Sequence, residues 1–250
     1  MTLKCVLAAF AIAAGLAAPA SALTITAIDG EWENAVSDGA DPITGQGTSD
    51  IRWGTSIGEG QSGYDFDATA TSFDVDADTQ FVLGTFTHLN FPVTGSALAT
   101  ADLVVNFTIS GLSSVLTSVF SFTHNETDNH WTGNLVPDSS ATCADGGQNG
   151  TGINVNGCAD LVTATSNAPS QNMFQIGGVT YMLEVLGFQY QGNLLTDFWT
   201  VERQTNTAQL LAVFRTVDDP QPPISDVPLP ASGLLLMAGL AGLFARRRFS

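Results

Sequence analysis

The chain has 250 residues, of which 44% are hydrophobic and 12% charged, and its formal charge at pH 7 is −17. The segment 23–226 holds all 24 acidic residues against three arginines, which leaves it a formal charge of −21. This balance excludes non-specific nucleic-acid binding, which needs cationic side chains to neutralise phosphates, and it argues equally against docking on anionic lipid. Such an excess of carboxylates keeps a protein soluble and invites divalent cations, although adaptation to a saline habitat explains it equally well.

The N-terminus has the three parts of an export signal. Lys4 supplies a positive charge, an apolar run covers 5–18, and the small residues Ala20 and Ala22 form the pattern that signal peptidase accepts. A short buried helix would explain the alanine content, but it would not explain the basic start or the cleavage pattern. We therefore predict a signal peptide over 1–22, cut after Ala22 by signal peptidase.

Short β-strands dominate the middle of the chain. Leu103, Val105, Phe107 and Ile109 recur at every second position, which is the period of a half-buried strand. No stretch outside the two termini keeps an apolar period of 3.6 residues. We predict an all-β fold over 23–217, a single β-sandwich of jelly-roll type. Its expected strands are 23–28, 50–53, 80–91, 103–110, 120–123, 179–185, 198–203 and 208–217.

Two cysteines remain after the signal peptide, which removes Cys5. Cys143 and Cys158 flank a segment rich in glycine and asparagine that cannot form a helix or a packed strand by itself. An even number of cysteines in an oxidising compartment favours a disulfide. Closing a loop of about 15 residues would contribute roughly 3 kcal/mol. A catalytic cysteine is disfavoured because no neighbouring residue offers an activating base.

The C-terminal part begins with an acidic, proline-rich linker over 218–226. The uncharged segment 231–245 would give about 22 Å of helix, against a hydrocarbon core of about 30 Å. Arginines at its end extend the effective span by snorkelling, and they mark the cytoplasmic side. We predict a transmembrane helix with the folded domain outside; a buried core helix would explain neither the terminal position nor the basic stop.

This tail resembles a known sorting signal, the VPLPA variant of the PEP-CTERM signals of Gram-negative bacteria. The resemblance covers 227–250 and implies recognition by an exosortase, a membrane-embedded peptidase-like enzyme, with cleavage near the proline-rich motif. It also implies an inner-membrane anchor at first, then a place in the cell envelope, on the cell surface or outside the cell, with exopolysaccharide as a possible partner. The residues that carry it are Val227, Pro228, Leu229, Pro230, Ala231, Arg246, Arg247 and Arg248.

A second resemblance lies within the predicted domain. The stretches 51–54, 62–66 and 81–90 are together similar to the THxN or choice-of-anchor β-domains of exosortase-sorted surface proteins. The resemblance implies a surface location and no particular chemistry. The motif for which that family is named falls on Thr87, His88 and Asn90.

Histidines are the first candidates for a metal site. His88 and His124 each follow a Phe-Thr pair and could lie side by side on adjacent strands, with His130 completing a group. A carboxylate such as Glu126 or Asp128 would then suit zinc or another transition metal. The favoured alternative is structural, with the Thr-His-x-Asn motif holding a strand end or turn by side-chain to backbone hydrogen bonds.

Calcium is the second metal considered. Asp74, Asp76 and Asp78 match the start of a calcium loop, but Thr79 and Thr85 stand where glycine and a bidentate glutamate are required. Strand alternation explains the same spacing, with the aspartates outward. The sequence therefore predicts no confident metal site and no cofactor, and leaves calcium open.

No phosphate loop, nucleophile elbow or zinc-protease helix motif occurs, so no catalytic residue is assigned and a non-enzymatic protein is expected. The favoured function is structural or adhesive. A carbohydrate-binding module is the alternative, with stacking side chains drawn from Trp32, Trp53, Trp131 and Trp199. A metal-dependent hydrolase would require the three histidines to converge.

Overall fold

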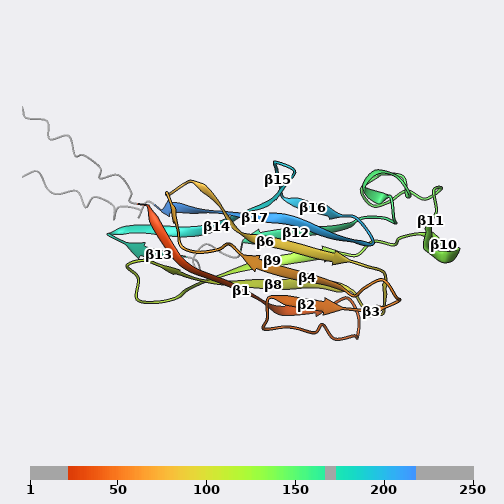
Figure 1. Cartoon of the computed structure of the whole chain (residues 1–250), viewed down its shortest axis with the longest axis horizontal. Helices are drawn as coiled ribbons and strands as arrows, with labels where there is room; N and C mark the ends of the chain where they lie inside the picture. The colour runs from red at the N-terminus through yellow and green to blue at the C-terminus, as the bar shows by residue number, and fades with distance from the viewer. Residues whose placement is uncertain (1–21, 167–172, 218–250) are drawn as a thin grey trace, which may run out of the picture. The chain divides into compact units, whose positions relative to one another are not determined.

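A computed structural model describes residues 22–166 and 173–217, which form two large antiparallel sheets and two small ones (Figure 1). Among these residues, one sheet has six strands in the order β16 (Asp197–Thr200), β12 (Asp160–Ser166), β9 (Leu116–Asn125), β8 (Leu98–Ile109), β1 (Leu23–Ser37) and β5 (Phe73–Val75). The other has β13 (Met173–Ile176), β14 (Val179–Tyr190), β17 (Gln204–Val217), β6 (Gln80–Asn90), β4 (Ser62–Ala68) and β2 (Asp50–Trp53), with β15 (Asn193–Leu195) beside β14.

The small sheets are two-residue pairings. β3 (Thr55–Ser56) pairs with β7 (Val93–Thr94), and β10 (Trp131–Thr132) pairs with β11 (Val136–Pro137). The described chain contains no α-helix, only the 3-10 turns η1 (Gly133–Leu135) and η2 (Gly152–Asn154). Accordingly, no helix within 22–166 or 173–217 is long and apolar enough to cross a membrane.

Strand alternation places the core between the two large sheets. β8 alternates buried and partly exposed residues along most of its length, as a strand with one covered face does. Aromatic rings meet from both sides: Trp32 of β1 lies 5.3 Å from Tyr64 of β4, and Phe122 of β9 lies 5.3 Å from Phe86 of β6. Such tilted and edge-on contacts stabilise a core beyond the area that they bury.

The all-β prediction is confirmed, and the expected strands are present with adjusted ends. β2 spans the predicted residues, whereas β1 continues nine residues beyond the expected end at Ile28 and β16 ends three residues before Arg203. The strands β4, β12 and β13 were not predicted. β13 has four residues and exposes the apolar Met173, so it shows no clear alternation. β4 does alternate, with Tyr64 and Phe66 buried on either side of Asp65, and the period of two could have predicted it.

Three predicted segments lie wholly or partly outside the described residues. They are the signal peptide over 1–22, the linker over 218–226, and the sorting tail over 227–250 with its helix and arginines. The last described strand, β17, runs to Val217, which is also the last residue that the structure describes.

Candidate functional site

Two histidines from facing sheets meet in the core. His88 lies near the end of β6 and His124 near the end of β9, and their ring centroids are 5.0 Å apart. Both positions follow from strand alternation, which turns these side chains inward. His88 is fully buried and His124 is 5% exposed.

Aromatic side chains enclose the histidine pair. The ring of Trp53, at the end of β2, lies 5.7 Å from His88 and 5.3 Å from His124. Tyr64 is the cross-strand neighbour of His88 in the β4–β6 pairing. Its hydroxyl lies 2.7 Å from Nδ1 of His124, a buried hydrogen bond that joins the two large sheets. The histidines are therefore shielded from solvent and fixed in orientation.

Three carboxylates complete the group, which we call the buried cluster: His88, His124, Glu126, Asp160 and Glu202. Asp160 is the first residue of β12, and Glu202 lies in the turn between β16 and β17. Both are fully buried, whereas the side chain of Glu126 is 29% exposed. Nε2 of His124 lies 3.2 Å from Oε2 of Glu126.

The cluster is compact enough to hold a metal ion. Potential ligand atoms of His88, His124 and Asp160 all lie within 4.8 Å of one another, and the same holds for Glu126, Asp160 and Glu202. Asp160 belongs to both groups. Imidazole nitrogens together with carboxylate oxygens are the ligands that zinc and related ions take in proteins.

Burial and mutual repulsion set the electrostatics of the cluster. Burial, followed by the charges of Glu126 and Glu202, raises the pKa of Asp160 well above its usual value. Burial and the charge of Glu126 raise the pKa of Glu202 to about 7, against the hydrogen bond from Asn129. Burial and the neighbouring His124 lower the pKa of His88. The site therefore favours neutral forms unless a cation compensates the carboxylates.

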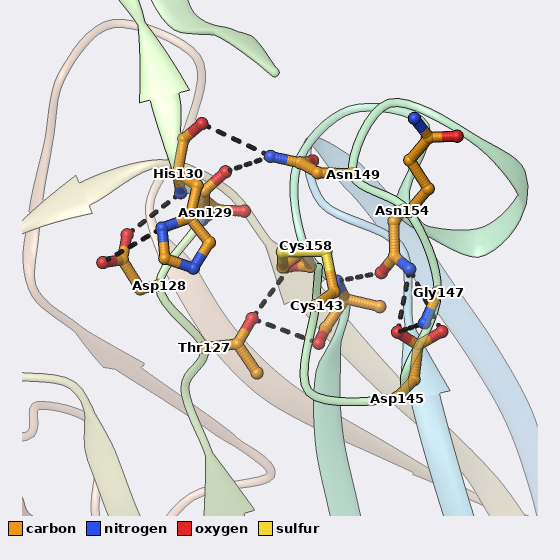
Figure 2. Close-up of a disulfide and its surroundings, with 12 residues drawn as sticks. Thr127, Asp128, Asn129, His130, Cys143, Asp145, Gly147, Asn149, Asn154 and Cys158 are labelled. Atoms are coloured by element: carbon orange, nitrogen blue, oxygen red, sulfur yellow. Dashed lines mark hydrogen bonds and ion pairs between the residues drawn. A yellow bond between two sulfur atoms is a disulfide. The ribbon is translucent and has the colours of Figure 1, made fainter. Parts of the chain in front are cut away.

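A loop lobe over 127–159, between β9 and β12, extends from one end of the sheets (Figure 1). Its disulfide joins Cys143 to Cys158, with the Cα atoms 5.3 Å apart, as predicted. Asn149 reinforces the lobe by donating from Nδ2 to the carbonyls of Asn129 and His130 (Figure 2).

Asp145 is the centre of a second group of hydrogen bonds within the lobe. Its carboxylate accepts hydrogen bonds from Asn154 Nδ2 and from the amide of Gly147, and Asn154 Oδ1 in turn accepts the amide of Ala159 (Figure 2). These bonds hold the glycine-rich loop around the disulfide without regular secondary structure. The disulfide is therefore part of a side-chain network rather than an isolated cross-link.

The lobe is tied to the buried cluster through two carboxylates. Asp160 accepts a hydrogen bond at Oδ1 from the amide of Thr127, and Glu202 accepts one at Oε1 from Asn129 Nδ2. The hydroxyl of Thr127 also donates to the carbonyls of Cys158 and Ala159 (Figure 2 draws Thr127 beside the disulfide). The lobe and the cluster therefore form one connected unit.

The prediction that His130 completes a group with His88 and His124 is wrong. The side chain of His130 is 43% exposed and pairs with Asp128, whose carboxylate is 80% exposed, at 3.6 Å. Figure 2 shows this pair in the lobe. The metal-dependent hydrolase hypothesis required all three histidines to converge. Only His88 and His124 do so, and the three-histidine set is therefore not formed.

One residue of the Thr-His-x-Asn motif makes a side-chain to backbone hydrogen bond of the kind expected. Asn90 donates from Nδ2 to the backbone carbonyl of Thr200 at the end of β16, over 3.2 Å. His88 Nδ1 lies 2.8 Å from the hydroxyl of the same Thr200. Thr87 is 8% exposed. The motif thereby joins β6 of one sheet to β16 of the other.

The aspartates considered for calcium do not form a group among the described residues. Asp74, Asp76 and Asp78 are exposed, but only Asp74 lies in a strand, β5. Asp76 and Asp78 lie in the connection between β5 and β6, so strand alternation does not explain their spacing. Asp74 accepts a hydrogen bond from Thr24, and Asp78 lies 3.6 Å from Arg215. Neither of the two groups close enough to share an ion includes them.

Sequence reasoning missed Asp160 and Glu202. Each is a single carboxylate in a chain rich in them, and only the fold brings Asp160 beside His88 and Glu202 beside Asp160. Asp160 begins an alternating run directly after Cys158-Ala159. This alternation is the one local signal that could have predicted an inward-facing carboxylate at position 160. Glu202 carries no such signal.

Comparison with known proteins assigns the tail. No curated protein matches this chain. Residues 226–248 match the family model of the PEP-CTERM protein-sorting motif. This motif implies processing by an exosortase, so the chain is an exported protein sorted to the cell surface.

Proposed function

We propose that the exported domain is a β-sandwich with a structural or adhesive role at the cell surface or in the extracellular matrix. A THxN-type domain and a VPLPA-type tail, cut near Pro230 and preceded by a cleaved signal peptide, are parts of the same proposal. The sorting motif supports the location at the cell surface. The supporting feature of the domain is that His88, Asp160 and Glu202 of the buried cluster are closed to macromolecules.

Burial carries this argument. His88, Asp160 and Glu202 are fully buried, so an extracellular polymer cannot reach them. The hydrogen bonds of the buried cluster join the two large sheets and the lobe, as expected of residues with a structural role. A non-enzymatic domain held rigid in this way suits a matrix component.

Carbohydrate binding is the second candidate and has narrower support. Trp32 and Trp53 belong to the core, but Trp131 and Trp199 are partly exposed. The indole of Trp131 donates to the carbonyl of Asn156 and so holds the lobe. Trp199 on β16 is therefore the tryptophan best placed to stack on a sugar ring.

The test is a strain of the native host that lacks the gene. We expect weaker surface attachment or matrix cohesion, restored by the wild-type chain and by a Trp199→Ala chain, but not by a chain truncated after Asp226. Unchanged attachment and cohesion would reject the structural role. Restoration by wild type but not by Trp199→Ala, when both are exported in equal amounts, would favour the carbohydrate module.

A further inference from the structure

His88 presents a buried lone pair without a donor. The hydroxyl of Thr200 donates to the carbonyl of Asp160 over 3.2 Å, so its oxygen accepts the proton of His88 Nδ1 at 2.8 Å. In a neutral imidazole the other nitrogen is then an acceptor. That nitrogen, Nε2, is buried and has no hydrogen-bond partner.

Two carboxylates add unpaired acceptors at the same place. Asp160 and Glu202 each use one oxygen to hold the lobe, and their second oxygens, Oδ2 and Oε2, are buried without a partner. A buried acceptor without a donor costs about 1–3 kcal/mol. The guanidinium of Arg203, the next residue after Glu202, pairs with Glu59 instead. No cationic side chain among the described residues is therefore hydrogen-bonded to the three unpaired acceptors, His88 Nε2, Asp160 Oδ2 and Glu202 Oε2.

We propose that the buried cluster binds one divalent transition-metal ion, for which zinc is the probe. The proposal is independent of the role assigned to the domain at the cell surface. The proposed ligands are two imidazoles and two carboxylates: His88, His124, Glu126 and Asp160.

The distances fit this assignment. Ligand atoms about 2.0–2.1 Å from a tetrahedral zinc ion lie roughly 3.4 Å apart. Nε2 of His124 and Oε2 of Glu126 are 3.2 Å apart, and the potential ligand atoms of His88, His124 and Asp160 lie within 4.8 Å of one another. His88 and Glu126 belong to different groups that share Asp160, so an ion held by all four ligands requires these two side chains to move toward each other. Two carboxylates balance the charge of the ion.

Outer contacts fix the ligands as in known metal sites. His88 is oriented by Thr200 through Nδ1, and His124 by Tyr64 through the same ring atom. The amide of Thr127 holds Asp160 at Oδ1 and leaves Oδ2 for the ion. Metal-bound histidines almost always have such a partner at their second nitrogen.

The donor set selects the class of ion. Calcium and magnesium prefer oxygen ligands, whereas paired imidazoles favour zinc and its neighbours in the first transition row. Burial indicates a structural ion that joins the two sheets and the lobe. Glu126, whose side chain is partly exposed, gives the ion a route to solvent.

The first experiment measures the metal in the full-length chain, exported from its host with the disulfide formed and purified without chelator. Elemental mass spectrometry should find about one transition-metal ion per chain, as a single structural site requires. Chelator should lower the Tm, and added zinc should restore it. A protein without such an ion, unchanged in Tm by both chelator and added zinc, would overturn the proposal.

Variants then assign the ligands. We expect the chelator-induced fall in Tm to disappear in His88→Gln and in Asp160→Asn, which keep polar side chains but remove a ligand atom or its charge. His130→Gln is the matched control and should keep both the ion and the fall in Tm. Tyr64→Phe should bind zinc about 10-fold more weakly, since it removes an outer contact.

Visible absorption of bound cobalt(II) tests the site in the wild-type protein and so does not depend on whether the variants fold. Cobalt(II) added to the metal-free wild-type protein should give the intense visible bands of a four-coordinate ion, and one equivalent of zinc should remove them. Cobalt bands that persist in folded His88→Gln would reject His88 as a ligand. Wild-type protein without visible bands would reject the four-coordinate site.

Discussion

Single residues of the Thr-His-x-Asn motif have separable tasks. His88 brings an imidazole into the buried cluster, whereas Asn90 bonds to the carbonyl of Thr200. Thr200 thus receives contacts from both residues, which fixes the end of β16 against β6. The motif is a connection between sheets, and this explains why a polar pair lies in an apolar core.

The substitution Asn90→Ala tests this connection. It leaves a buried carbonyl with one partner fewer and should lower the free energy of unfolding by about 1–3 kcal/mol. Chemical denaturation measures the change. Asn193→Ala is the control, because Asn193 is exposed and makes a 3.4 Å contact with Gln191, and it should change stability by less than about 0.5 kcal/mol. Equal effects of the two substitutions would contradict the proposed task of Asn90.

Single site residues could be predicted only where a local sequence motif or strand alternation marked them. The motif and the repeated Phe-Thr-His triplets pointed to His88 and His124, and strand alternation turned both inward. Asp160 and Glu202 could not be chosen, because their proximity depends on where β12 begins and where β16 ends in the folded chain. His130 was wrongly grouped because sequence distance does not show that the chain leaves the sheet after β9.

At the scale of elements, regular strands were predictable and irregular segments were not. β6 and β8 contain long apolar alternations, so their existence followed from the period of two. β4 and β13 have only seven and four residues, and their pairing is fixed by the strands beside them. The lobe has almost no regular structure, and its shape comes from hydrogen bonds of asparagine and aspartate side chains.

The disulfide should therefore stabilise the lobe more than any single hydrogen bond does. Replacing both cysteines, Cys143→Ala with Cys158→Ala, should lower the free energy of unfolding by about 3 kcal/mol, the value for a loop of roughly 15 residues. Urea denaturation measures this loss. Reductant should weaken the wild type to a similar extent and leave the variant unchanged; a variant as stable as the oxidised wild type would show that the hydrogen bonds alone hold the lobe.

On the scale of the whole molecule, charge and sorting act together. The segment 23–226 has a formal charge of −21, and its three arginines all pair with carboxylates, Arg52 with Asp65, Arg203 with Glu59 and Arg215 with Glu184. Such a surface is repelled by anionic lipid. We therefore expect attachment to the membrane to depend on the sorting tail.

Intact mass spectrometry of the surface and medium fractions of the native host tests this dependence. We expect a mature chain that lacks 1–22 and the segment beyond about Pro230, because signal peptidase and an exosortase remove the two ends. In a host without the exosortase, the chain should keep its tail and stay in the membrane fraction, since the acidic domain has no other affinity for lipid. A full-length tail in the wild-type host would mean a simple C-terminal anchor, and the exosortase would then have no part in placing the domain.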